Sequence, residues 1–123
     1  MSKTNFHHVR DFHARFGVAP NANLLDQRES FLREEAAETY EAIANLRNAQ
    51  TPGQQKQAKA HLLKELVDVL YVTYGFIDLL GLDADKAFAE VQRSNMSKTP
   101  NAEPGGKVQK GLHYSPANME QFV

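Results

Sequence analysis

Acidic side chains on two long helical segments are the residues of this chain best suited to chemistry. Glu35 and Glu38 lie three residues apart in one segment, and Glu65 and Asp68 lie three residues apart in another. Residues with this spacing share a face of a helix. Each segment is therefore predicted to carry two carboxylates on one side.

The first acid pair shares its face with residues that should be packed. At ~100° per residue, Glu35 and Glu38 fall inside an otherwise apolar arc of roughly 120°, and Glu34 and Glu41 fall at its border. The apolar members of the arc are Phe31, Leu32, Ala42, Ile43 and Leu46. Since Glu-rich helices are often solvated, this segment alone leaves open an interpretation in which nearby Lys and Arg neutralise the acids.

Solvation explains the second acid pair less well. Residues 66–80 are apolar nearly all round, which predicts a central, buried helix, and Glu65 and Asp68 project from it in line with Val72. One buried unpaired carboxylate costs several kcal/mol, and four would exceed the net stability of a domain, about 5–15 kcal/mol. Because few basic residues lie on these faces, we expect a divalent cation to neutralise the acids.

The ligand types indicate which cation this would be. Four carboxylates without cysteine favour Mg²⁺, with Mn²⁺ as a substitute, over Zn²⁺. A di-iron bundle is the alternative, but it uses Glu-x-x-His on two helices. Here the two spacings end in Glu38 and Asp68, although His61, one turn before Glu65, keeps iron open.

Polar residues elsewhere suit a phosphate-bearing substrate. Acids around Mg²⁺ commonly serve to hold substrate phosphates. Asn95 and Lys98 continue the apolar stripe of the last predicted helix, and Arg93 lies nearby. These residues could bind phosphate, but the pattern equally fits a helix that ends at Asn95 with a solvated Lys98.

Helix-breaking residues separate the elements that must position these groups. Helices are predicted at residues 6–16, 24–49, 54–80 and 84–95. Gly17, Thr51-Pro52-Gly53 and Gly81 end or separate them, and glycine and proline are frequent after residue 96. The prediction is an all-α bundle of four to five helices with an irregular C-terminal tail at 96–123, forming a single domain over 1–123.

Composition narrows the function classes. The chain has 123 residues, 41% of them hydrophobic, with 14 Lys and Arg against 15 Asp and Glu, and no cysteine. The net charge of −1 argues against nucleic-acid and membrane-surface binding. The lack of cysteine excludes a disulfide scaffold and a thiol nucleophile. No apolar run approaches the ~18 residues of a membrane span, and no signal-peptide core is present, so we expect a cytoplasmic protein.

The acidic motifs and the tail resemble those of a known family. Arg33-Glu34-Glu35-Ala36-Ala37-Glu38, followed by Glu65-Leu66-Val67-Asp68, resembles the EExxE…ExxD signature of the all-α nucleoside triphosphate pyrophosphohydrolases. These include the MazG-like proteins, the phosphoribosyl-ATP pyrophosphohydrolases and the dimeric dUTPases. The segment 68–75 and the tail at 91–116 are most similar to a MazG-like branch.

The resemblance implies Mg²⁺-dependent cleavage of a nucleoside triphosphate to monophosphate and pyrophosphate. Such a reaction removes unwanted nucleotides from the nucleotide pool. It gives Glu35, Glu38, Glu65 and Asp68 the role of metal ligands, and either Glu34 or Glu35 the activation of water. Phosphate charge would be bound by Arg93, Asn95, Lys98, Lys107 and Lys110. A homodimer or a dimer of dimers is expected, as in the family.

The residues that would select the nucleobase are the hardest to identify from the sequence. His13 lies on the apolar stripe of the first helix between Val9 and Phe16, as a histidine at the edge of a core would. Alternatively, Phe12, His13 and Phe16 flank the nucleobase and Asn23 or Gln27 reads its edge. The resemblance implies dUTP, dCTP or damaged nucleotides as substrates, and among these a pyrimidine deoxynucleotide is expected.

Two further classes of function are alternatives to an enzyme. The first is a non-catalytic nucleotide or metal sensor on the same scaffold, but the complete acidic set argues against it. The second is a helical interaction module, which leaves the acids unexplained.

Overall fold

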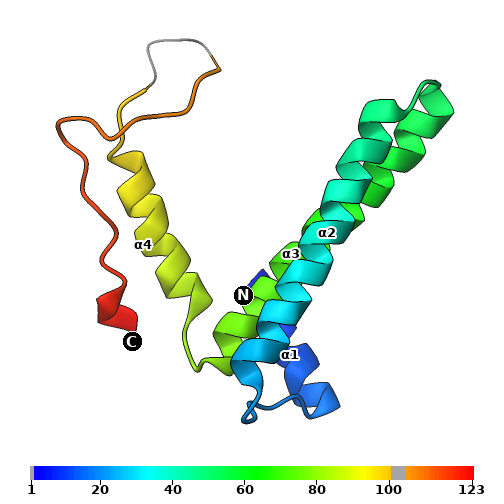
Figure 1. The fold of residues 1–123 in the computed structure, drawn as a ribbon. Helices are drawn as coiled ribbons and strands as arrows, with labels where there is room; N and C mark the ends of the chain where they lie inside the picture. The colour runs from blue at the N-terminus through cyan, green and yellow to red at the C-terminus, as the bar shows by residue number, and fades with distance from the viewer. Residues whose placement is uncertain (1, 101–104) are drawn as a thin grey trace. The chain divides into compact units, whose positions relative to one another are not determined.

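A computed structural model describes residues 2–100 and 105–123 of the chain (Figure 1). The helices in these residues are α1 (Asn5–Phe16), α2 (Leu24–Asn48), α3 (Pro52–Leu79) and α4 (Ala84–Met96), with a 3₁₀ turn at Glu120–Phe122. The described residues form no strand, and their β-type pairing is an isolated bridge between Thr99 and Gln109. The predicted all-α fold with an irregular C-terminal region is confirmed.

Short-range interactions set the helix ends. The Thr4 hydroxyl accepts a hydrogen bond from the His7 amide at the start of α1, and Gly17 ends α1 with a left-handed φ of 65°. The Asp83 carboxylate accepts bonds from two amides at the start of α4. Such caps satisfy amides that have no partner inside the helix.

The start of α3 differs from the expectation. Thr51-Pro52-Gly53 was predicted to interrupt the chain before a helix at 54–80, but α3 already begins at Pro52. Thr51 is its N-cap, and Thr51 and Gln54 form a reciprocal capping box. Proline is favourable as the first helical residue, because an amide hydrogen at that position would lack a helical partner. These residues therefore start the helix.

The described chain divides into two compact units, Met1–Gly81 and Leu82–Val123. In the first unit α2 and α3 lie side by side, joined by a short connection (Figure 1), and α1 packs on α3. Phe6 and Val9 of α1 are fully buried, and the Phe6 ring lies 6.1 Å from that of Tyr74 on α3. The single domain over 1–123 stays a prediction.

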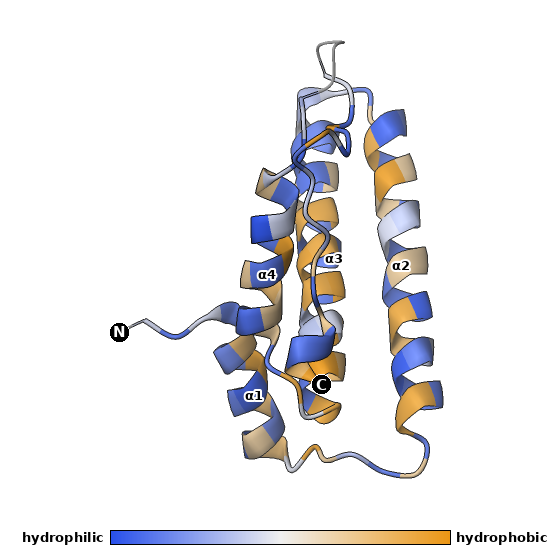
Figure 2. Ribbon diagram, turned by 90° about the vertical axis from the view of Figure 1, so that its left-hand side faces the viewer, coloured by the Kyte–Doolittle hydropathy of each residue, from blue (hydrophilic) through white to orange (hydrophobic). Residues whose placement is uncertain are grey.

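The second half of α3 is less buried than its sequence indicated. Figure 2 shows hydrophobic residues over much of this part of the helix. Leu66, Val67 and Leu70 keep 46%, 48% and 51% of their surface exposed, so the prediction of a helix buried all round is wrong for the single chain. The predicted association into dimers, which would cover such residues, stays a prediction.

In the second unit the tail is bonded to α4. Arg93 forms a two-bond ion pair with Glu90 and also donates to the Ser115 hydroxyl. The Asn118 amide donates to Glu90 at 2.7 Å. The bonds from Arg93 and Asn118 lower the pKa of Glu90 to about 2. Among the described residues, no helix is both long and apolar enough to cross a membrane.

Candidate functional site

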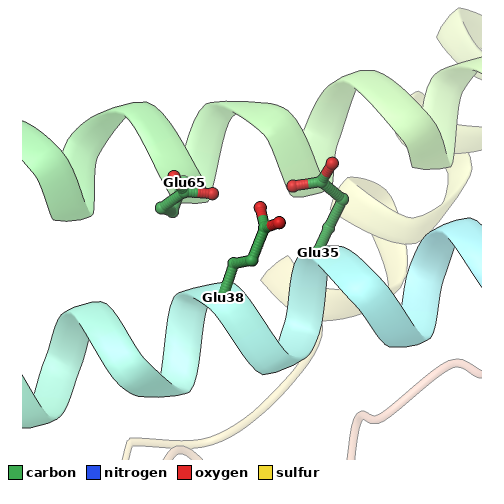
Figure 3. Close-up of side chains that lie close together, drawn as sticks. All are labelled: Glu35, Glu38 and Glu65. Atoms are coloured by element: carbon green, nitrogen blue, oxygen red, sulfur yellow. The ribbon is translucent and has the colours of Figure 1, made fainter.

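Three of the four predicted metal ligands meet between α2 and α3. Glu35 and Glu38 extend from α2 and Glu65 from α3, and their carboxylates point into the space between the two helices (Figure 3). One oxygen of each carboxylate lies within 4.8 Å of the other two. The three-residue spacing on α2 accounts for this arrangement, because it turns Glu35 and Glu38 toward α3 together.

The charge of this acid cluster, Glu35, Glu38 and Glu65, is poorly compensated. Glu65 is only 5% exposed. Its Oε2 atom and that of Glu35 are buried and have no hydrogen-bond partner among the described residues. Burial, followed by the charges of Glu38 and Asp68, raises the pKa of Glu35. Orphaned buried carboxylate oxygens are costly, so the cluster is suited to bind a cation.

Asp68 lies beside the acid cluster in a different environment. The sequence predicted a packed carboxylate, but the Asp68 side chain is 30% exposed and pairs with the Lys64 ammonium at 2.6 Å. The expectation that basic residues are lacking on these faces is thus wrong for Asp68. Its hydrogen bond and charge raise the pKa of Lys64, and its charge still raises the pKa of Glu35.

The donor set fits a hard divalent cation. Its ligand atoms are carboxylate oxygens, which Mg²⁺ and Mn²⁺ prefer. His61, the residue that kept iron open, is exposed, and its Nε2 atom lies 3.8 Å from Glu65 Oε1. Glu34, the other candidate for water activation, lies exposed on α2, whereas Glu35 lies in the cluster. The geometry therefore brings together Glu35, Glu38 and Glu65.

A cavity of about 510 Å³ lies between the three helices of the first unit. Phe12, His13 and Gln27 line it, and their predicted contact with a base stays a prediction. Phe16 is not among the lining residues and packs on Phe12, with ring centroids 4.9 Å apart. The α2 residues of the wall precede Glu35 on the same helix, so the cavity and the acid cluster follow one another along α2.

The predicted phosphate-binding residues all belong to the second unit. Arg93 donates hydrogen bonds to Glu90 and to the Pro116 carbonyl of the tail. Asn95 is exposed in the last turn of α4. Lys98 is half-buried after α4. Lys107 and Lys110 are exposed, and the Lys110 ammonium lies 5.2 Å from the centre of the Tyr114 ring. Their approach to the acid cluster stays a prediction.

The model of the phosphoribosyl-ATP pyrophosphohydrolase family matches residues 9–95, more than half of the chain. The chain belongs to this family. No curated protein matches it. As a member, it is a pyrophosphohydrolase, a hydrolase of phosphoric anhydrides that acts on a nucleotide-like substrate. This confirms the superfamily expected from the acidic motifs.

The family match includes all four predicted ligands and every residue that lines the cavity, whereas the tail after residue 95 lies outside it. Sequence reasoning about this pyrophosphohydrolase did not assign several cavity residues to the site, among them Arg28, Phe31 and Tyr71. Arg28 could have been found, because it lies seven residues before Glu35 and thus on the same face of α2. Tyr71 comes from another helix and offered no such signal.

Proposed function

We propose that the chain is a Mg²⁺-dependent nucleoside triphosphate pyrophosphohydrolase. It would cleave a deoxynucleotide such as dUTP or dCTP between the α and β phosphates. The observation that carries the proposal is the acid cluster, in which one oxygen of each carboxylate lies within 4.8 Å of the other two. In addition, Oε2 of Glu35 and Oε2 of Glu65 are buried and have no hydrogen-bond partner among the described residues. Membership of a pyrophosphohydrolase family gives the class of bond that is cleaved.

Glu35, Glu38 and Glu65 would hold the cation, and Mn²⁺ would substitute for Mg²⁺ in an assay. Asp68 would join them when its carboxylate leaves Lys64, an exchange of low cost because exposed ion pairs contribute about 0–1 kcal/mol. When bound, Mg²⁺ supplies neutralisation of the phosphate oxygens and stabilises charge on the leaving pyrophosphate. The protein's part is to fix the carboxylates before substrate arrives.

Glu35 is the better of the two candidates to activate water. Its carboxylate lies within the cluster, whereas Glu34 is exposed. Glu35 would orient a water molecule and accept its proton as the water oxygen bonds to the α phosphorus. The bond from the α phosphorus to the bridging oxygen then breaks, and pyrophosphate leaves with the electron pair.

Two alternatives are separable from this proposal. The family description makes phosphoribosyl-ATP a competing substrate. A non-catalytic sensor on the same scaffold would bind a nucleotide without turnover. The complete acid cluster favours an enzyme, because a protein that has lost catalysis usually lacks one of the acids.

Phosphorus products test the proposal. The protein is incubated with Mg²⁺ and each ribo- and deoxynucleoside triphosphate, or phosphoribosyl-ATP, in water labelled with heavy oxygen. We expect monophosphate and pyrophosphate in equal amounts, with the label in the monophosphate. Glu38→Gln should abolish turnover, whereas Glu41→Gln, an exposed acid of the same helix, should leave it unchanged.

Each other outcome contradicts a defined part of the proposal. Orthophosphate with a diphosphate product would refute attack at the α phosphorus. Turnover of phosphoribosyl-ATP alone would refute the triphosphate substrate. Tight binding without turnover would favour the sensor.

A further inference from the structure

A buried arginine without an acceptor is the most unusual group of the cavity. Arg28 on α2 is only 7% exposed, and its Nε atom is buried without a hydrogen-bond partner. No described residue accepts a hydrogen bond from its guanidinium group, which lies 4.9 Å from the centre of the Phe31 ring. Burial lowers the pKa of Arg28. Since a buried guanidinium needs acceptors, we expect a ligand to provide them.

His13 on α1 provides the complementary group. Its Nδ1 atom lies 2.6 Å from an Asp78 oxygen on α3, and Arg10 lies 3.6 Å from the other oxygen of that carboxylate. Because a carboxylate only accepts hydrogen bonds, Nδ1 carries a proton, and in this tautomer of the imidazole Nε2 is the acceptor. Asp78 thus sets the tautomer and the direction of the imidazole.

Gly75 on α3 brings the donor and the acceptor to one place. A Cβ atom at this position would lie 3.2 Å from Arg28 Nη1 and 3.3 Å from His13 Nε2. Both atoms therefore approach the same point above the α3 backbone, and any larger residue would crowd them. The donors of Arg28 and the acceptor of His13 therefore lie close to each other in the cavity wall.

The remaining wall suits a flat ring. Phe12, Phe31 and Tyr71 line the cavity, and the Phe12 and Tyr71 rings meet edge to face at 5.6 Å. Its volume of about 510 Å³ lies within the usual range for small-ligand sites. Arg28 lies seven residues before Glu35, or about 10 Å along the helix axis, which leaves room for a sugar between a base and phosphates at the acid cluster.

We propose that this cavity selects nucleobases with a lactam edge, a carbonyl next to a ring N–H, as in uracil, thymine and guanine. Arg28 donates to the carbonyl oxygen, and the ring N–H donates to His13 Nε2. Cytosine and adenine present an amino group and an unprotonated ring nitrogen instead, so donor would face donor and acceptor would face acceptor. The inference rests on the proposed function and makes it specific, because it chooses dUTP over dCTP.

Paired substrates test this choice. We expect kcat/KM for dUTP to exceed that for dCTP, and that for dGTP to exceed that for dATP, each by roughly 10- to 100-fold, as expected for loss of a charged hydrogen bond. Arg28→Met keeps most of the apolar stem of the side chain without its donors and should reduce both ratios, while the His13 acceptor still favours a ring N–H. Arg47 is an exposed arginine on the same helix, so Arg47→Met is the matched control. It should leave both kcat/KM ratios unchanged.

Binding without turnover separates this inference from the proposed function. Calorimetric titration with dUMP and dCMP in EDTA measures recognition of the base alone, and dUMP should bind more tightly. Equal binding, or preference for dCMP, overturns the inference even if pyrophosphate is released normally. Displacement of dUMP by inorganic phosphate in the wild type but not in Arg28→Met would also overturn it, because Arg28 would then bind an anion. The wild-type ratios decide the matter even if Arg28→Met does not fold.

Discussion

Glu65→Gln should stabilise the metal-free protein, which is unusual for a substitution at a buried residue. The Glu65 carboxylate is 5% exposed, and oxygens of Glu35 and Glu38 lie within 4.8 Å of one of its own. Two unit charges at 4.8 Å repel by about 3.5 kcal/mol at an effective dielectric constant of about 20. Solvent around Glu38 screens part of this repulsion, so we expect a gain of about 1–3 kcal/mol. The new amide can also donate a hydrogen bond to a neighbouring carboxylate.

Thermal unfolding with and without metal measures this effect. In EDTA, Glu65→Gln should melt several degrees above the wild type, since each kcal/mol moves Tm by about 2–8 °C for small domains. In Mg²⁺ at 100 times its dissociation constant, the wild type should gain about 2.7 kcal/mol by linkage. The variant should gain less, because one ligand is lost, so the difference between the two proteins should narrow or reverse.

Glu41→Gln is the control for the loss of an acid from α2 or α3, because Glu41 is exposed and lies outside the acid cluster. It should leave both melting curves unchanged. A Glu65→Gln protein that melts below the wild type in EDTA and still gains as much from Mg²⁺ would refute the reasoning. The buried carboxylate would then be stabilised by the protein itself.

Two further results are expected. Lys64→Met removes the cation that competes for Asp68, so the Mg²⁺ concentration giving half the maximal rise in Tm should fall severalfold; an unchanged or higher concentration would show that Asp68 takes no part. In the second unit, the pKa of Glu90 is lowered to about 2 from 4.5, so its contribution to stability is present above pH 4.5 and lost as the pH falls toward 2. The Asn118 amide resonance should report this titration near pH 2, and a midpoint near 4.5 would contradict the bonding of the tail to α4.

Local sequence determined the helices and the spacing of the acids. Thr4, Gly17 and Asp83 act within one turn of their own position, so their capping roles could be predicted without knowledge of the fold. The same holds for Glu35 and Glu38, because residues three apart share a helix face wherever that helix lies. Thr51-Pro52-Gly53 was misread because proline and glycine start a helix as readily as they interrupt one when a capping threonine precedes them.

Only the tertiary structure decided which side chains meet. Asp68 follows the same spacing rule as Glu38, yet the packing of α3 leaves it partly exposed and within reach of Lys64. Arg28, His13 and Gly75 belong to three different helices, and His13 and Gly75 are 62 positions apart in sequence. They lie close together only because of the way those helices pack. The periodicity of one helix indicates the direction of a side chain but not the chemistry of the group opposite. For that reason the acids were predictable from the sequence, and the arginine and histidine that we propose to read the base were not predictable as a pair.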